Sequence, residues 1–374
     1  MFPGAWFLAV QRATWTQVRR PLFKTWLRMS SFSVGVDLGG TNLRVAAYSR
    51  TSGLLETIHL PTRLVAGRHA VVEDMCRAIH KLLASYSTQY PLAGIGIGTP
   101  GPLELPAGRL HNPPNLPGWD GFELRTEIEA CLDMPVTVES DANVAALAEC
   151  LLGSGQTLGI DSLCMLTLGT GIGNGIVLNG RIWHGAHGMA GEAGHTNIWP
   201  DGPACGCGSN GCLEMYASAT AVRRIALESA HSGKAPAIAA LAERNHDFTT
   251  RDLADLAENG SSDAQKVFDD VGRALGIGIG DLVNTLNLPL YVVGGGLANA
   301  WELFSPILFK EVRHRSYVYR LTEPGSAILN GNVNAGTRII AAELGADSGL
   351  LGACILPYTL SEQKIASTPD TTLR

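Results

Sequence analysis

The stretch Ser33-Val-Gly-Val-Asp-Leu-Gly-Gly-Thr-Asn-Leu-Arg-Val-Ala-Ala-Tyr48 predicts two strands joined by a glycine turn. The apolar runs 33–37 and 43–48 are typical of buried strands, and the turn lies between them. The pattern returns at 163–178, where a strand leads through Gly169-Thr-Gly-Ile-Gly173 into another apolar run. We call these segments the first and second glycine hairpins, and their likeness favours an internally duplicated α/β protein over a chance similarity of turns.

The rest of the chain alternates between expected strands and helices. In the first half we expect strands at 54–60, 92–98 and 136–138, and helices at 69–86, 122–132 and 141–152. In the second half we expect strands at 289–293 and 326–329, and helices at 217–230, 235–244, 250–259, 263–286, 301–314 and 334–344.

This alternation predicts two α/β domains with a cleft between them. We place the N-terminal domain at 32–150, the C-terminal domain at 151–352 and a tail at 353–374. The last helix of the C-terminal domain is expected to pack back on the N-terminal domain.

Composition and charge narrow the functional class. The chain has 374 residues, of which 45% are hydrophobic and 17% charged, as in a globular protein with large cores. A net charge of −6 argues against a general attraction to nucleic acid or to a membrane surface. No apolar run has the length needed to span a bilayer.

The segment 1–31 differs from the rest of the chain, because it has five basic residues, three tryptophans and no acidic residue. We expect an extension outside the fold, either a disordered tail or the result of a start codon assigned upstream of Met29. A targeting or interfacial segment is the alternative, and whether the mature protein contains 1–28 stays open. The segment is too short for a DNA-binding winged-helix domain.

One histidine and three cysteines crowd into the loop 195–212, which we call the metal loop: His195, Cys205, Cys207 and Cys212. Three thiolates and an imidazole form a closed ligand set for structural Zn²⁺. A disulfide beside an incidental histidine is the alternative, but a Cys-X-Cys pair has poor geometry for bridging to itself. The other five cysteines are scattered in apolar or helical sequence, as expected in a reducing compartment such as the cytoplasm.

The glycine turns are candidate phosphate sites. Glycine lets backbone N–H groups approach an anion, and Asp37 at the end of a strand could hold Mg²⁺ through water. A plain hairpin turn is the alternative. The residues expected to bind ATP and Mg²⁺ are Asp37, Gly39, Gly40, Thr41, Asn42, Arg44, Thr170, Gly171, Gly173, Gly294, Gly295 and Gly296.

Two common nucleotide-binding motifs are excluded. Gly96-Ile-Gly-Thr-Pro-Gly101 matches the dinucleotide fingerprint, but Pro100, Pro102 and Pro106 prevent the helix that must follow it. The sequence has neither the phosphate-binding loop of P-loop proteins nor the catalytic loop of protein kinases.

Ser140-Asp141-Ala-Asn143 opens an expected helix directly after a strand. Asp141 could cap that helix, which is the usual role of aspartate at this position. The alternative is a general base at the edge of the cleft, since phosphoryl transfer needs one acceptor for the proton of the attacking hydroxyl.

These motifs together resemble the ROK family of sugar kinases and repressors over residues 32–351. Asp37-Leu-Gly-Gly-Thr-Asn-Leu-Arg44, Gly98-Thr-Pro-Gly-Pro102, Asn115-Leu-Pro-Gly-Trp119 and the metal loop with its flanks occur in the family's order. The resemblance implies the two-domain, actin-like sugar kinase fold, an RNase H-like unit duplicated around an interdomain cleft. It implies ATP-dependent phosphorylation of a hexose and, for this chain, a homodimer.

The resemblance also implies roles for individual residues. Asp141 matches the catalytic base, and the metal loop residues match the zinc ligands. Ser140 departs from the asparagine that is common in the family, which weakens any inference about specificity. The expected sugar-binding residues are Gly101, Asn115, Ser140, Glu192, His195 and Glu214.

We predict a cytoplasmic glucokinase that uses ATP, Mg²⁺ and structural Zn²⁺, with no nucleic acid or membrane partner. N-acetylmannosamine kinase and fructokinase are the alternatives of the same class. A sugar-responsive transcriptional regulator and a non-catalytic sugar-binding protein are the alternatives of other classes. The sequence leaves open which hexose is used and whether polyphosphate replaces ATP.

Overall fold

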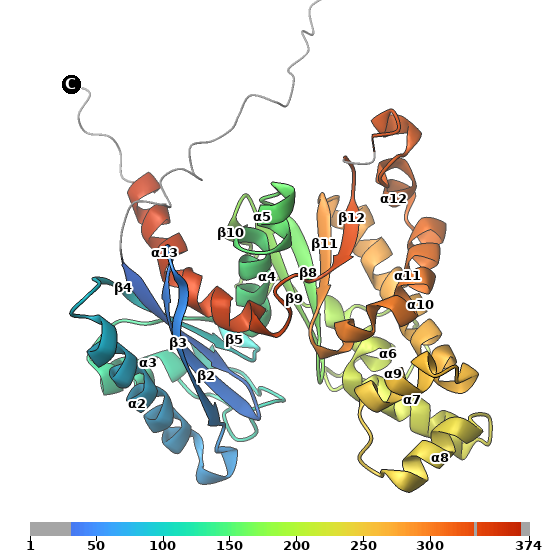
Figure 1. Cartoon of the computed structure of the whole chain (residues 1–374), viewed down its shortest axis with the longest axis horizontal. Coiled ribbons are helices and arrows are strands. Elements are labelled where there is room, and N and C mark those ends of the chain that lie inside the picture. Colours follow the sequence, from blue (N-terminus) through green and yellow to red (C-terminus); the bar gives the residue numbers. More distant parts are fainter. Residues whose placement is uncertain (1–30, 333–334, 368–374) are drawn as a thin grey trace, which may run out of the picture.

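The computed structural model describes residues 31–332 and 335–367, and it contains two five-stranded sheets (Figure 1). The expected extension therefore lies, except for its last residue, outside the described residues. The first sheet has the order β3-β2-β1-β4-β7, with strands β1 (Phe32–Leu38), β2 (Asn42–Ser49), β3 (Gly53–Pro61), β4 (Leu92–Thr99) and β7 (Thr137–Ser140). The second has the order β10-β9-β8-β11-β12, with strands β8 (Leu163–Leu168), β9 (Ile172–Leu178), β10 (Arg181–Ile182), β11 (Leu290–Gly294) and β12 (Arg338–Ala341).

The two sheets repeat one topology. Strands β1, β2 and β3 form an antiparallel meander, and β4 and β7 continue the sheet in parallel to β1. Strands β8, β9 and β10 form the same meander, and β11 and β12 continue it in parallel to β8. The glycine hairpins β1–β2 and β8–β9 occupy equivalent places, which confirms the duplicated, two-domain α/β fold.

Helices cover both sheets and separate them. Helices α2 (Arg68–Tyr86) and α3 (Leu124–Leu132) lie with the first sheet, and α10 (Ser262–Leu286) packs against α11 (Trp301–Arg315) beside the second. A short pair of strands, β5 (Leu103–Glu104) and β6 (Arg109–Leu110), lies in the loop after β4. The remaining helices are α4 (Asp141–Leu151), α5 (Ser154–Leu158), α6 (Glu214–Ala217), α7 (Ala219–His231), α8 (Pro236–Arg244), α9 (Thr250–Glu258), α12 (Tyr317–Thr322) and α13 (Ser348–Ser367).

The C-terminal part differs from the sequence prediction. The strand expected at 326–329 is a single 3-10 turn, the helix expected at 334–344 is replaced by strand β12, and the tail expected at 353–374 is largely helix α13. Ile339 and Ile340 pair in parallel with β11. Isoleucine is β-branched, and β-branched residues favour strands. Helix α13 is buried on several sides, so it lacks the amphipathic period that reveals a surface helix.

Helix α13 runs back across the chain and packs on the first sheet. It contacts β1 and β4 and lies beside α4 in the space between the two sheets (Figure 1). Gly96 of β4 allows this approach, because a Cβ there would overlap the carbonyl oxygen of Ala353. One core cluster joins Tyr48, Val144 and Met165 to α13 and so links the two halves of the chain. None of the described helices is long and apolar enough to cross a membrane.

Candidate active site

A cleft of about 350 Å³ lies where the two halves of the chain meet. The loop after β4, the start of α4 and the turn of the second glycine hairpin contribute to its walls, as do the segment 188–195 and α6. Eleven of the residues predicted from the sequence line it: Gly101, Asn115, Ser140, Asp141, Thr170, Gly171, Gly173, Glu192, His195, Glu214 and Gly295.

Asp141 is the first residue of α4, and Ser140 takes the N-cap position. The interpretation of Asp141 as an N-cap is therefore wrong. Its Oδ1 accepts the N–H of Ala142 at 2.7 Å. Desolvation in the cleft raises the pKa of Asp141 to about 6, and the negative charges of Asp37 and Glu192 act in the same direction. The carboxylate is thus poised to take up a proton near neutral pH.

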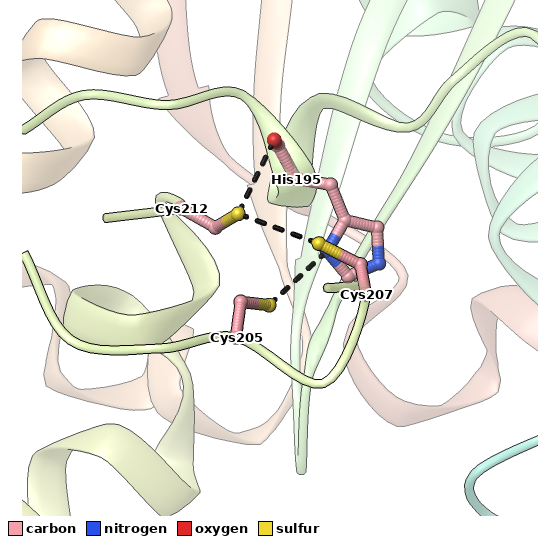
Figure 2. A group of neighbouring side chains, drawn as sticks. All are labelled: His195, Cys205, Cys207 and Cys212. Carbon is pink, nitrogen blue, oxygen red and sulfur yellow. Dashed lines mark hydrogen bonds between the residues drawn. The ribbon is translucent and has the colours of Figure 1, made fainter. Parts of the chain in front are cut away.

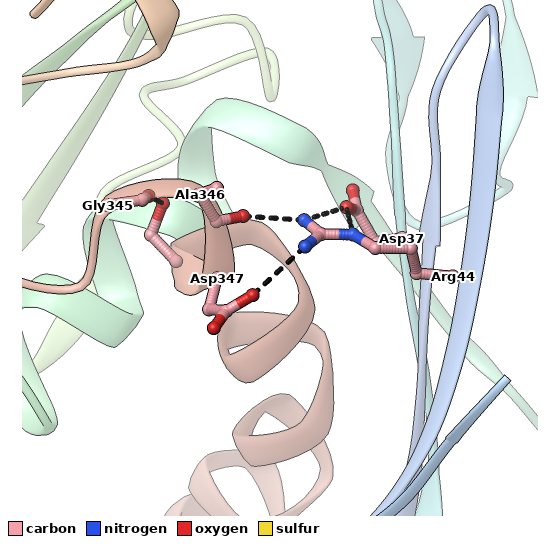
Figure 3. A network of polar contacts seen from close by, with 6 residues as sticks. Asp37, Arg44, Gly345, Ala346 and Asp347 are labelled. Atoms are coloured by element: carbon pink, nitrogen blue, oxygen red, sulfur yellow. Dashed lines mark hydrogen bonds and ion pairs between the residues drawn. The ribbon is translucent and has the colours of Figure 1, made fainter. Parts of the chain in front are cut away.

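The first glycine hairpin places Asp37 near the end of β1. Arg44, on the adjacent strand β2, donates to Asp37 Oδ2 through Nε at 3.0 Å and Nη2 at 2.6 Å. The same guanidinium donates to the carbonyl oxygen of Ala346 at 2.6 Å and to Asp347 at 3.1 Å (Figure 3). Arg44 was predicted to bind ATP and Mg²⁺, and in the structure its contacts orient Asp37.

The turn of the second glycine hairpin is held by Glu214 of α6. Glu214 Oε2 accepts the N–H of Ile172 at 2.8 Å. A Cβ at Gly171 would overlap that same oxygen, so the turn can approach the carboxylate only because residue 171 is glycine. This contact brings a candidate phosphate loop and a candidate sugar ligand to one place in the cleft.

Glu192 and His195 line the same cleft. Their side chains approach each other to 3.9 Å between Glu192 Oε2 and His195 Nε2. Burial raises the pKa of Glu192, the charge of Glu214 adds to this shift, and His195 opposes it. Three polar side chains therefore converge on one region, and their donors and acceptors suit a polyhydroxylated ligand.

The four residues of the metal loop come together as predicted (Figure 2). Their ligand atoms all lie within 4.8 Å of one another. Cys205 Sγ and His195 Nδ1 are 3.6 Å apart, as are Cys207 Sγ and Cys212 Sγ. Tetrahedral Zn²⁺ with its usual bond lengths separates sulfur from nitrogen by about 3.6 Å and sulfur from sulfur by about 3.8 Å. The site therefore fits a tetrahedral ion of this size.

His195 links this cluster to the cleft. Its Nδ1 faces Cys205, whereas its Nε2 lies on the side of Glu192. Cys212 lies two residues before Glu214 in the sequence. The backbone N–H of Leu213, between them, donates to the carbonyl oxygen of Thr196 at 2.9 Å. An ion at the cluster would fix the positions of His195 and Glu214 together.

Some predicted residues lie outside the cleft lining. The turn residues Gly39, Gly40, Thr41 and Asn42 form a tight hairpin in which the N–H of Gly39 donates to Asn42 at 2.9 Å. Together with Asp37, Arg44, Gly294 and Gly296, these residues are absent from the lining.

Among the lining residues that the sequence analysis did not assign to the site are the buried polar side chains of Glu139 and Asn143. Both are almost fully buried, at 4% exposure. Glu139 sits in the short strand Thr137–Ser140, where a buried charged residue is unusual, and that is the signal that could have revealed it.

Comparison with known proteins gives one consistent result. A sequence model described as the ROK family matches residues 33–359. A glucokinase from Halalkalibacterium halodurans is 35% identical over 321 residues, which cover 85% of this chain and 92% of the relative.

Solved structures of the same family superpose on the chain. The ROK hexokinase of Thermus thermophilus has a TM-score of 0.70 and 32% identity, with 89% of this chain and 99% of that chain covered. A ROK family glucokinase from Streptomyces griseus, solved in complex with glucose and AMPPNP, has a TM-score of 0.70 and 30% identity, with coverage of 88% and 100%.

Relatives with other names also match. An N-acetylmannosamine kinase from Haemophilus influenzae is 29% identical, covering 86% of this chain and 93% of the relative. A xylose repressor from Caldicellulosiruptor bescii is 27% identical, covering 80% of this chain and 74% of the relative. Similarity alone therefore leaves the choice of sugar open.

Proposed function

This chain belongs to the ROK family, and we propose that it is a hexose kinase that transfers the γ-phosphoryl group of ATP to the 6-hydroxyl of glucose. The observation that carries the proposal is Asp141. It lies in the cleft at the start of α4, and its raised pKa of about 6 suits a general base that works near neutral pH.

Asp141 would accept the proton of the attacking hydroxyl as its oxygen bonds to the γ-phosphorus, while the bond from that phosphorus to the β,γ-bridging oxygen breaks and ADP leaves. In phosphoryl transfer the protein mainly positions the reactants and stabilises charge, so one well-placed acceptor is sufficient. The N–H groups at the start of α4 also favour an anion there, which keeps the carboxylate available below neutral pH.

The two glycine hairpins are the proposed binding sites for the phosphates of ATP. The turn at 169–173 lines the cleft, and because the N–H groups of Gly169 and Ile172 donate within the protein, those of Thr170 and Gly171 are the proposed donors to an anion. Asp37, held by Arg44, is the carboxylate placed to hold Mg²⁺ through water. When bound with the nucleotide, Mg²⁺ would supply positive charge beside the transferred phosphoryl group.

The part of the cleft beside the turn at 169–173 is the proposed sugar site. Glu192 and Glu214 offer acceptors for ring hydroxyls, and His195, when its Nδ1 binds the ion, offers the N–H of Nε2 as a donor. Asn115 and Gly101 line the same cleft. Zn²⁺ at the metal loop would act as a structural staple, because four protein ligands leave no open position for a catalytic water. Closure of the two halves around the sugar would exclude water and limit hydrolysis of ATP.

A substrate panel tests the proposal. ADP release is measured with MgATP and glucose, N-acetylmannosamine, fructose, mannose or allose, and the panel is repeated with polyphosphate as donor. Glucose is expected to give the highest kcat/KM with ATP. The Asp141→Asn variant should lose roughly a thousandfold in kcat while it still binds glucose, since removal of a general base costs about 10²–10⁴-fold.

Other outcomes would redirect the proposal. Turnover on another sugar alone would keep the mechanism and change the substrate. Near-normal turnover of Asp141→Asn would remove the base assignment. Sugar binding without turnover of any donor would favour a transcriptional regulator. This is the second candidate function, because a xylose repressor is among the relatives.

A further inference from the structure

Glu139 is a buried carboxylate next to the start of α4. Glu139 is only 4% exposed, although it lies near the end of β7 and lines the cleft. Its Oε1 accepts the N–H of Ser140 at 2.9 Å and the side-chain amide of Asn143 at 2.9 Å. Both donors flank Asp141 in the sequence, so Glu139 braces the turn that carries the proposed base.

The second oxygen of this carboxylate reaches the other half of the molecule. Glu139 Oε2 pairs with His184 Nε2 at 2.6 Å. His184 follows β10 in the second sheet, whereas Glu139 belongs to the first sheet. The pair therefore bridges the two halves of the chain at the wall of the cleft.

His184 begins the segment that leads to the proposed sugar ligands. Its carbonyl oxygen accepts the N–H of Ala190 at 3.0 Å, which closes a loop over 184–190. Residues 188–192 of this segment line the cleft, and Glu192 ends it. A contact that holds His184 therefore also fixes the N-terminal end of the segment that carries Glu192.

We propose that Glu139 and His184 are positioning residues that hold Asp141 and the segment 184–192 in register across the cleft. The inference rests on the proposed function and adds two residues to it, neither of which is expected to touch the reacting atoms. Because of this pair, a change in the orientation of Asp141 also changes the position of Glu192.

The charges at the pair support this role. A buried carboxylate is stable only when its oxygens receive strong donors, and here a backbone N–H, an amide and an imidazole provide them. The hydrogen bond to Glu139 raises the pKa of His184 and so favours its cationic form. Removal of either partner leaves the other without its counterpart in a wall of the cleft.

A double-mutant cycle with His184→Ala and Glu139→Gln tests the inference. We expect each variant to lose on the order of tenfold in kcat/KM for glucose, with the KM for ATP changed less than about twofold. The double variant should lose little more than either single variant, because both changes break one contact. His184→Gln should recover part of the loss, since its amide can still donate to Glu139.

The matched control is His69→Ala. His69 forms an exposed pair with Glu127 at 3.7 Å on α2 and α3, away from the cleft lining, so its loss should leave kcat/KM unchanged. Additive losses, or a lowered melting temperature with unchanged kinetics, would overturn the inference and leave the pair a merely structural contact.

Calorimetric titration with glucose keeps this test separate from the proposed function. A wild-type protein that binds glucose but never phosphorylates it would refute the kinase proposal alone. In that case the same cycle is measured on the glucose dissociation constant, where coupling between the two variants supports the inference and additivity refutes it.

Discussion

Arg44 clamps Asp37 through two hydrogen bonds to a single oxygen, Oδ2, at 3.0 Å from Nε and 2.6 Å from Nη2. The same guanidinium reaches Ala346 and Asp347, in the connection between β12 and α13 (Figure 3). The end of β1 is thereby tied to the point where the chain returns from the second sheet to the first. The orientation of Asp37 thus depends on how the two halves are joined.

Replacement of Arg44 by lysine tests this clamp. A lysine keeps the charge but cannot form the fork of donors that Asp37, Ala346 and Asp347 share. We expect kcat/KM for ATP to fall about tenfold, and the free energy of unfolding to fall by about 2 kcal/mol from the loss of charged hydrogen bonds. Steady-state kinetics and urea denaturation measure the two effects.

The control for Arg44 is Arg77→Lys on α2, where the side chain is 71% exposed and pairs with Asp74. Arg77 is exposed, and the buried Asp74 keeps its two hydrogen bonds from Arg63, so neither quantity should change measurably. Equal losses in both variants would show that Arg44 has no special connection with Asp37.

The pH dependence of turnover follows from Asp141. Its pKa of about 6 means that the carboxylate is protonated at lower pH and cannot accept the proton of the attacking hydroxyl. We therefore expect kcat/KM for the sugar to fall as pH decreases through about 6 and to level off above it. Measurement from pH 5 to 8 checks this, with circular dichroism as a control for unfolding.

The Asp141→Asn variant separates this effect from other titrations. Its residual activity should be low, and its plot of kcat/KM against pH should show no inflection near pH 6, because the titrating carboxylate is gone. If the same inflection persists in Asp141→Asn, another group is responsible and the base assignment fails.

Local patterns predicted much of the fold and of the candidate site. The glycine hairpins, the metal loop and the start of α4 are each specified by a few neighbouring residues, so the sequence places them correctly. The equivalence of the two hairpins also predicted the duplicated sheets, because each hairpin opens its own α/β unit.

Features that depend on distant contacts were not predicted. Most of residues 350–358 of helix α13 are buried between the two halves, so this part of the helix has no alternation of apolar and polar positions that could reveal it. The bond between Glu139 and His184 joins residues 45 positions apart, and the contacts of Arg44 with 346–347 span the whole fold. Only the folded chain brings these pairs together.

The packing of α13 gives a prediction about stability. A methyl group at Gly96 would overlap the carbonyl oxygen of Ala353, and backbone atoms cannot rotate away as a flexible side chain can. We expect Gly96→Ala to lower the free energy of unfolding by about 3 kcal/mol, as overpacking of a tight core does. Ser52→Ala, in the exposed turn after β2, is the control in urea denaturation and should leave the stability unchanged. An unchanged midpoint for Gly96→Ala would mean that α13 does not rest on β4.

Metal content is the most direct test of the loop 195–212. The distances between Cys205 Sγ and His195 Nδ1, and between Cys207 Sγ and Cys212 Sγ, fit tetrahedral Zn²⁺. We expect about one zinc per chain by elemental analysis, and Cys207→Ser should lower this content and the melting temperature. The same variant should weaken glucose binding more than ATP binding, because His195 and Glu214 lose their common support.

Cys131→Ser is the matched control, since Cys131 is an exposed free thiol on α3, outside the cluster. A Cys207→Ser protein with full zinc content, or a wild-type protein that holds no metal after purification without chelators, would contradict a structural zinc site.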